Sequence, residues 1–199
     1  MTNELKQFLV DNKNLLTRND FDGIYKKAIS ELQSALIKEL TEFLYNLAQV
    51  DPLKYMSSIP QRMFFGVVLS NELVVPANIK LDSLSIKSMA VPTLRLQCDL
   101  VSKCIVGCSF NNVIIDSEIS KIPSNCFYSC TIEKVRLPET VLRIGNDAFG
   151  EISSVKIITP YRDNPQKRLI VPKNEVQWYK DHLKFTHAPK ESEEEVQGE

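Results

Sequence analysis

The 199-residue sequence is poor in the residues that mark catalysis, export and membrane insertion. Its two histidines, His182 and His187, lie in no phosphate loop, dinucleotide fingerprint, metalloprotease helix or known nucleophile motif, and both are expected to be exposed. No stretch approaches the roughly 18 apolar residues of a membrane-spanning helix, and the N-terminus lacks the basic and apolar regions of a signal peptide. These absences predict a non-enzymatic cytoplasmic protein without a cofactor, a metal site or a membrane contact.

The sequence also lacks an excess of either charge, with 24 basic and 25 acidic residues and a net charge of −1. This balance gives no reason to expect bulk DNA as a partner, and the 43% hydrophobic share is typical of a globular chain. The charge is nevertheless uneven, because five glutamates lie in residues 191–199. Without them 24 basic and 20 acidic residues remain, a net charge of +4. Residues 189–199 are predicted to form a disordered acidic tail.

Residues 1–60 are predicted to form a helical N-terminal module. Apolar residues recur at steps of three and four, at Phe21, Tyr25, Ala28, Leu32, Leu36, Leu40, Phe43 and Leu47. This spacing predicts one helix of about 28 residues with a single apolar stripe, ended by Asp51-Pro52. The stripe is expected to face the core, against a shorter amphipathic helix that begins after Thr2 or against the next domain. The alternative is a self-associating seam that makes a homo-oligomer through residues 20–49.

Residues 61–188 have a different character, with glycine and proline between short runs of valine, isoleucine and leucine that favour strands. A self-alignment at a period of about 22 residues pairs Val113 with Val135, Ile122 with Ile144, Cys104 with Cys126, and Phe127 with Phe149. Repeats of this length cannot bury their apolar sides alone and must stack. The sequence therefore predicts a β-solenoid, with the two phenylalanines inside the coil and a tight turn at Gly145.

The best-formed unit, residues 135–149, combines a strand with Leu137-Pro138, Val141-x-x-Ile144-Gly145 and Ala148-Phe149. It resembles the BspA-like (Treponema pallidum type) leucine-rich repeat. Weaker copies lie in residues 113–138 and 91–112, and a degenerate one lies around residues 73–76. Residues 169–180 resemble the closing strand and helix of the same family. The resemblance covers about half of the chain and implies an α+β fold: a helical module, a short leucine-rich-repeat solenoid, and a C-terminal helical cap at about 169–188.

The N-terminal part resembles a segment that precedes such repeats in short bacteriophage and gut-bacterial proteins. The shared residues are Phe43-Leu44, the stretch 51–56, and Ile59-Pro60. This resemblance implies a phage or prophage origin, and with it a location in the host cytoplasm.

Four of the five cysteines form the pairs Cys104-x3-Cys108 and Cys126-x3-Cys130, one repeat apart. Buried cysteine packs as a small hydrophobic residue, so a stacked row inside the solenoid is the preferred interpretation. A zinc site and disulfides are the alternatives that this spacing leaves open.

Strand alternation predicts which repeat residues point outward. With Val135 pointing inward, the outward set is Asn112, Ile114, Lys121, Lys134, Arg136, Arg143, Lys156 and Ile158. Stacking is expected to align Lys134 with Lys156, Lys121 with Arg143, and Ile114 with Arg136 and Ile158. Isoleucines flanked by lysine and arginine are compatible with an interaction surface for a partner. The preferred interpretation of the charges taken alone is solubility and protection of the sheet edge.

Residues 161–190 are rich in lysine and arginine, and Trp178 is expected to pack onto the last coil as a lid. The preferred function is non-catalytic protein binding, with a host or anti-phage defence protein as the partner and inhibition as the outcome. One alternative is a structural or virion-associated oligomer. The other is nucleic-acid binding through this basic C-terminal region.

Overall fold

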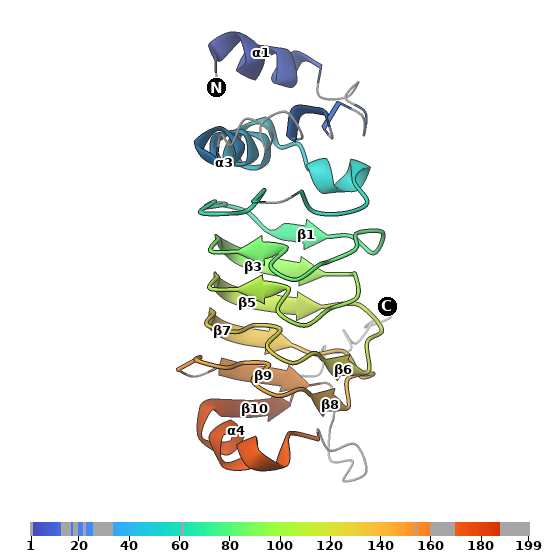
Figure 1. Ribbon diagram of the computed structural model, residues 1–199, viewed down its shortest axis with the longest axis vertical. Coiled ribbons are helices and arrows are strands. Elements are labelled where there is room, and N and C mark those ends of the chain that lie inside the picture. The colour runs from blue at the N-terminus through green and yellow to red at the C-terminus, as the bar shows by residue number, and fades with distance from the viewer. Residues whose placement is uncertain are drawn as a thin grey trace, which may run out of the picture.

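The computed structural model describes residues 2–12, 17, 20–21, 23–25, 34–60, 62–153, 155–159 and 170–187. Figure 1 shows an elongated molecule in which helices occupy the N-terminal end and parallel strands stack below them. Each coil of the chain adds one strand to the stack, which is a β-solenoid.

One wall of the solenoid is a parallel sheet with the strand order β1-β3-β5-β7-β9-β10. Its strands are β1 (Leu73–Val75), β3 (Ala90–Leu96), β5 (Ser109–Ile115), β7 (Thr131–Arg136), β9 (Val155–Thr159) and β10 (Leu183–His187). Shorter pairs form on the other side of the coil: β2 (Ile86–Lys87) with β4 (Ile105–Val106), and β6 (Lys121–Ile122) with β8 (Arg143–Ile144). The predicted stacking of repeats is confirmed, including the degenerate unit at β1.

The period of the repeat holds where the sequence is most regular and shortens elsewhere. Val113 of β5 lies opposite Val135 of β7, and Val135 lies opposite Ile157 of β9, so these two coils have equal lengths that match the period of the sequence. Leu94 of β3 lies opposite Val113, so the coil between them is shorter. This shorter connection explains why the repeat pattern is hard to see before residue 104.

The core is one continuous cluster of buried side chains that runs from Leu9 to Ile157. Phe127 and Phe149 are fully buried inside the coil, and their stacked rings lie 5.4 Å apart with an interplanar angle of 8°. Gly145 is required here for close packing, because a Cβ at this position would lie 2.6 Å from the backbone nitrogen of Ser124. The predicted role of Gly145 as a turn residue is therefore refined: it lets two coils approach each other.

The N-terminal module contains α1 (Asn3–Asp11), α3 (Ser34–Glu42), the π-helical η1 (Phe43–Ala48) and the 3-10 helix η2 (Pro52–Tyr55). Residues 20–21 and 23–25 are also helical, whereas residues 26–33 of the expected long helix lie outside the described residues. The predicted stripe is wrong at its end, because Leu47 is 75% exposed. The wider π-helical turn shifts the buried face to Leu44 and Ala48.

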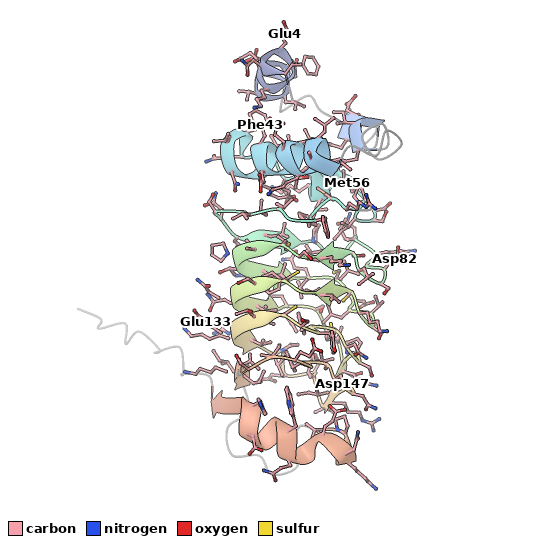
Figure 2. The ribbon with its side chains drawn as sticks, turned by 60° about the vertical axis from the view of Figure 1, so that its left-hand side comes forward. Glu4, Phe43, Met56, Asp82, Glu133 and Asp147 are labelled. Atoms are coloured by element: carbon pink, nitrogen blue, oxygen red, sulfur yellow. The ribbon has the colours of Figure 1, made fainter. Side chains whose placement is uncertain are left out.

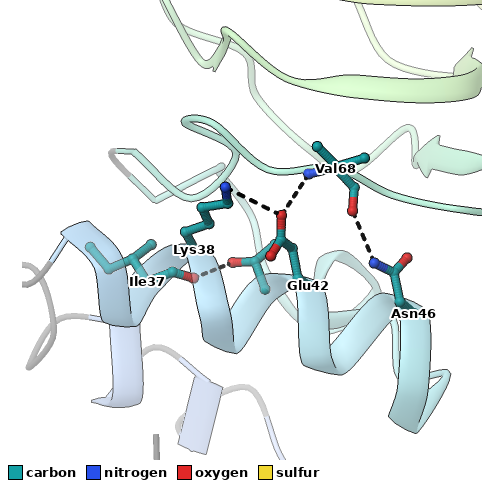
Figure 3. Close-up of polar contacts among 6 residues, drawn as sticks. Ile37, Lys38, Glu42, Asn46 and Val68 are labelled. Atoms are coloured by element: carbon teal, nitrogen blue, oxygen red, sulfur yellow. Dashed lines mark hydrogen bonds and ion pairs between the residues drawn. The ribbon is translucent and has the colours of Figure 1, made fainter.

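Two side chains of this module close the first edge of the solenoid (Figure 3). Glu42 accepts a hydrogen bond from the backbone nitrogen of Val68 at 2.8 Å, and Asn46 donates one to the Val68 carbonyl at 2.9 Å. The Asn46 side-chain oxygen also accepts a bond from the nitrogen of Ser70 at 2.9 Å. These bonds satisfy backbone groups that would otherwise offer an open edge for strand addition.

The C-terminal part contains α4 (Val176–His182) and then β10, which pairs in parallel with β9. The expectation of a helical segment to about residue 188 is therefore wrong for residues 183–187, which form a strand. Trp178 is partly buried against the core, and the ring of His182 stacks on it at 4.5 Å, so His182 is not the fully exposed residue that was expected. No helix in the described part of the chain is long and apolar enough to cross a membrane.

Candidate functional site: the outward face of the parallel sheet

The outward face of the long sheet carries two rows of side chains that run across the strands. In the first row, Asn112 of β5 lies opposite Lys134 of β7, and Lys134 lies opposite Lys156 of β9. In the second row, Ile114, Arg136 and Ile158 are neighbours in the same order. Both predicted alignments are confirmed. We call these six residues the ladder.

The buried partners on the same strands show why the ladder faces outward. Val135 and Ile157 are fully buried, so Lys134, Arg136 and Lys156 on either side of them are exposed. Ile114 and Ile158 are half-buried rather than exposed. The face is therefore apolar at its floor and cationic at its upper surface.

The pairing of β5 with β7 is interrupted for one residue next to the first row. The register skips Asn111 and Glu133, whose neighbours on both sides are paired. Figure 2 shows Glu133 on the sheet side of the solenoid and Asp82 on the opposite side. Glu133 is exposed and borders the ladder, so it sets the limit of the cationic surface.

The second row continues beyond the ladder onto β3, where the equivalent position holds an arginine that is already neutralised. Arg95 of β3 lies opposite Ile114, and its guanidinium binds Glu72 at 3.0 Å and Asp116 at 2.6 Å. These two carboxylates raise the pKa of Arg95, with Asp116 the stronger cause. Within the described residues no carboxylate pairs with Arg136, Lys134 or Lys156. Among the described residues, the positive charge of Arg95 is therefore balanced by carboxylates, whereas that of the ladder is not.

The ladder encloses a shallow depression of about 180 Å³. It is lined by five ladder residues and one further residue: Asn112, Ile114, Lys134, Arg136 and Ile158, together with Val113. An apolar side chain fits such a hollow while acidic groups beside it meet the lysines and the arginine.

The remaining two predicted residues lie apart from the ladder. Lys121 of β6 lies opposite Arg143 of β8, as expected, and both are exposed. They belong to the two-stranded sheet on another side of the coil, so the structure does not bring them to the same surface.

The sequence analysis missed a lysine whose backbone position continues the register of the first row. The backbone register places Lys184 of β10 opposite Lys156, so three consecutive strands carry lysine at equivalent positions. The alternation Leu183-Lys184-Phe185-Thr186-His187 signals a strand. Lys184 lies further along the chain from Lys156 than one repeat, so a search at the repeat period does not find it.

The paired cysteines lie inside the coil in two stacked rows. Cys104 and Cys126 are in contact, with their sulfurs 3.6 Å apart, which is too far for a disulfide bond. Burial raises the pKa of the Cys126 thiol, and it raises that of Cys98 to about 12. Thiols kept protonated in this way, as at Cys98 and Cys126, are poor metal ligands and poor nucleophiles, whereas the hydrogen bond with Cys126 lowers the pKa of Cys104. The described residues contain no group of three or more histidine, cysteine or acidic side chains arranged to hold a metal.

Comparison with known proteins identifies the repeats. Residues 82–165 match the family model of the BspA type leucine rich repeat region (6 copies). The leucine-rich-repeat match includes the strands from β2 to β9 and leaves the N-terminal module outside it, so the phage-type resemblance of that module stays a prediction. No curated protein and no solved structure matches the chain. Leucine-rich repeats of this kind suggest a protein-interaction module.

Proposed function

We propose that this protein is a non-catalytic module that binds a protein partner on the ladder. The observation that supports this most strongly is the contrast between Arg95 and Arg136 in one row. Arg95 has two carboxylates within 3.0 Å, whereas Arg136 beside the depression has none among the described residues. Charges kept only for solubility do not explain why the unpaired ones gather around an apolar hollow.

The chemistry of the ladder defines the partner it fits. Lysine and arginine attract carboxylates and speed association, and arginine and isoleucine in a hollow supply the contact that holds the complex. The expected partner therefore presents an apolar side chain flanked by acidic residues. Each exposed charge pair contributes about 0.2–1 kcal/mol, so three of them together change affinity by about threefold to about 150-fold.

Affinity capture from a bacterial lysate tests this proposal, using the wild-type chain, the variant Lys134→Glu/Arg136→Glu/Lys156→Glu, and a matched variant. The matched variant carries Lys54→Glu/Lys87→Glu/Lys103→Glu at three exposed lysines outside the ladder. A protein lost by the ladder variant and retained by the matched variant supports the proposal. Identical captures by all three chains contradict it.

The finer form of this proposal is that the partner is a host or anti-phage defence protein, which the complex inhibits. It is supported by the resemblance of the N-terminal module to segments of short bacteriophage proteins. Identification of the captured protein as unrelated to defence contradicts it, and the binding proposal survives that result.

We also propose that α4, with Trp178 packed on the last coil, forms a helical cap at the C-terminal end of the solenoid.

A structural role through self-association is the second candidate function. It is favoured by exposed apolar side chains near the N-terminal edge: Leu47 at 75%, Val68 at 57% and Phe65 at 46%. Light scattering at high concentration tests it, because a strict monomer contradicts an oligomer through residues 20–49.

Nucleic-acid binding through residues 161–190 stays a prediction, and binding that does not weaken with salt would contradict it.

A further inference from the structure

The last described residues of the chain form β10, which lies next to the ladder strand β9. Thr186 of β10 lies opposite Ile158, and His187 lies opposite Thr159, one position beyond the second row. Twelve residues follow His187. His187 is the last residue that the structure describes, and it lies in β10, the strand next to that of Lys156.

The composition of these twelve residues complements the ladder. They contain Glu191, Glu193, Glu194 and Glu195, followed directly by Val196, the one branched aliphatic residue of the segment. This is the combination of acidic groups and one apolar side chain that the ladder and its depression fit. The segment therefore has the chemistry expected of the partner.

The segment is also long enough. Residues 188–196 span up to about 30 Å when extended. The distance from β10 to β5 is three strand spacings, or about 14 Å. Val196 can therefore reach the depression between Ile114, Arg136 and Ile158 with several residues left for the turn. Attachment to the same chain supplies an effective concentration of about millimolar.

We propose that residues 191–196 of the chain occupy the ladder, with the glutamates against Lys134 and Lys156 and Val196 in the depression. A protein partner must displace them, so the segment acts as an autoinhibitory stand-in for the partner. The competition rests on the proposed function, whereas the occupancy itself does not.

The test measures the acylation rates of individual lysines in the full chain by peptide mass spectrometry, with no partner present. Lys134 and Lys156 report on the ladder, and exposed Lys87 and Lys103 are internal controls. The variants are Glu191→Gln/Glu193→Gln/Glu194→Gln/Glu195→Gln, which removes the charges, and Val196→Ser, which removes only the apolar group. All of these changes lie outside the described fold.

Occupancy predicts that Lys134 and Lys156 react at least about threefold faster in the glutamine variant at low salt, and somewhat faster in Val196→Ser. The difference should disappear near 0.5 M salt, because the Debye length is then only about 4 Å and the attraction between the glutamates and the lysines is screened. Lys87 and Lys103 should not change. Equal ladder rates in wild type and both variants overturn the proposal. Protection that vanishes on dilution also overturns it, because it would come from a second copy of the chain.

These outcomes are separate from those of the capture experiment. The labelling result concerns only the chain itself, so it can fail while a partner still depends on the ladder. Conversely, a capture that fails with the wild-type chain and succeeds with the glutamine variant supports both the binding surface and its occupation.

Discussion

Lys134 lies directly opposite Lys156 on neighbouring parallel strands, and both side chains are exposed. Like charges at directly opposite positions destabilise a sheet. Within the described residues no carboxylate relieves this pair. A fold that retains such a pair retains a cationic surface at a small cost in stability, as expected where the surface serves binding.

The first prediction concerns this pair. Lys156→Glu replaces repulsion with an attractive cross-strand pair and should raise the free energy of unfolding by about 0.2–1 kcal/mol. The same change should weaken capture of the partner. Urea denaturation measures the stability, with Lys103→Glu as the matched control. A loss of stability in Lys156→Glu would contradict the observed register.

The second prediction concerns the closed N-terminal edge. Asn46→Ala removes the bonds to the Val68 carbonyl and the Ser70 nitrogen, and should lower the free energy of unfolding by about 1 kcal/mol. It should also increase self-association, because backbone groups at the edge lose their partners. Denaturation and light scattering measure the two effects. Asn71→Ala, at an exposed position nearby, is the control and should leave both unchanged.

The third prediction separates close packing from backbone freedom. Gly145→Ala places a Cβ 2.6 Å from the Ser124 nitrogen and should destabilise the protein by about 1–3 kcal/mol. Gly23 is helical and has no atom within 4 Å of an added Cβ. Gly23→Ala should therefore raise stability by up to about 1 kcal/mol. Thermal unfolding of both variants measures the difference, and a Gly145→Ala protein as stable as the wild type would refute the packing argument.

The fourth prediction concerns alkaline pH. Tyr25 is buried and bonded to Thr41 at 2.9 Å, and Tyr45 donates to Asp51 at 2.8 Å. Burial raises the pKa of both phenols above the ordinary value of about 10. Their contribution to the free energy of unfolding is fully present below about pH 10. It is lost as the pH rises further, because the two phenols then ionise in the unfolded chain while they stay protonated in the folded one. Each residue lowers stability by about 1.4 kcal/mol per pH unit in that range.

The variant Tyr25→Phe should make the alkaline decline shallower, since one of the two phenols is gone. Urea denaturation between about pH 9 and pH 11 measures how steeply the free energy of unfolding falls with pH. This range covers about one pH unit on either side of the tyrosine pKa in the unfolded chain. The control is Tyr55→Phe at a partly exposed position, which retains the ring stacked on Phe21. An unchanged slope in Tyr25→Phe would argue against ionisation of the unfolded chain as the cause.

The outward set could be predicted from sequence because strand alternation and a fixed repeat place residues without any knowledge of loops. Once Val135 is inside, Lys134 and Arg136 must point out, and a step of one repeat brings Lys156 and Ile158 beside them. The stacked phenylalanines follow from the same period. Their positions depend on local periodicity alone.

The errors arise where geometry departs from that regularity. The π-helical turn at Phe43–Ala48 moves the apolar face by one residue and exposes Leu47, which a regular α-helical period does not anticipate. The connection before β10 is longer than one repeat, so a search at the repeat period misses Lys184. The connection after β3 is shorter than one repeat, so the period does not hold there. The neutralisation of Arg95 by Glu72 and Asp116 depends on side chains from other coils, so only the fold shows that Arg136 differs from Arg95.

The most direct test of the account is calorimetric titration of the captured partner with the full chain, because the central claim is that the ladder holds that partner. The account predicts that Lys134→Glu/Arg136→Glu/Lys156→Glu raises the Kd by at least about 30-fold, whereas Lys54→Glu/Lys87→Glu/Lys103→Glu changes it by less than about threefold. An unchanged Kd in the ladder variant, or equal losses in both variants, would contradict the assignment of this surface as the binding site.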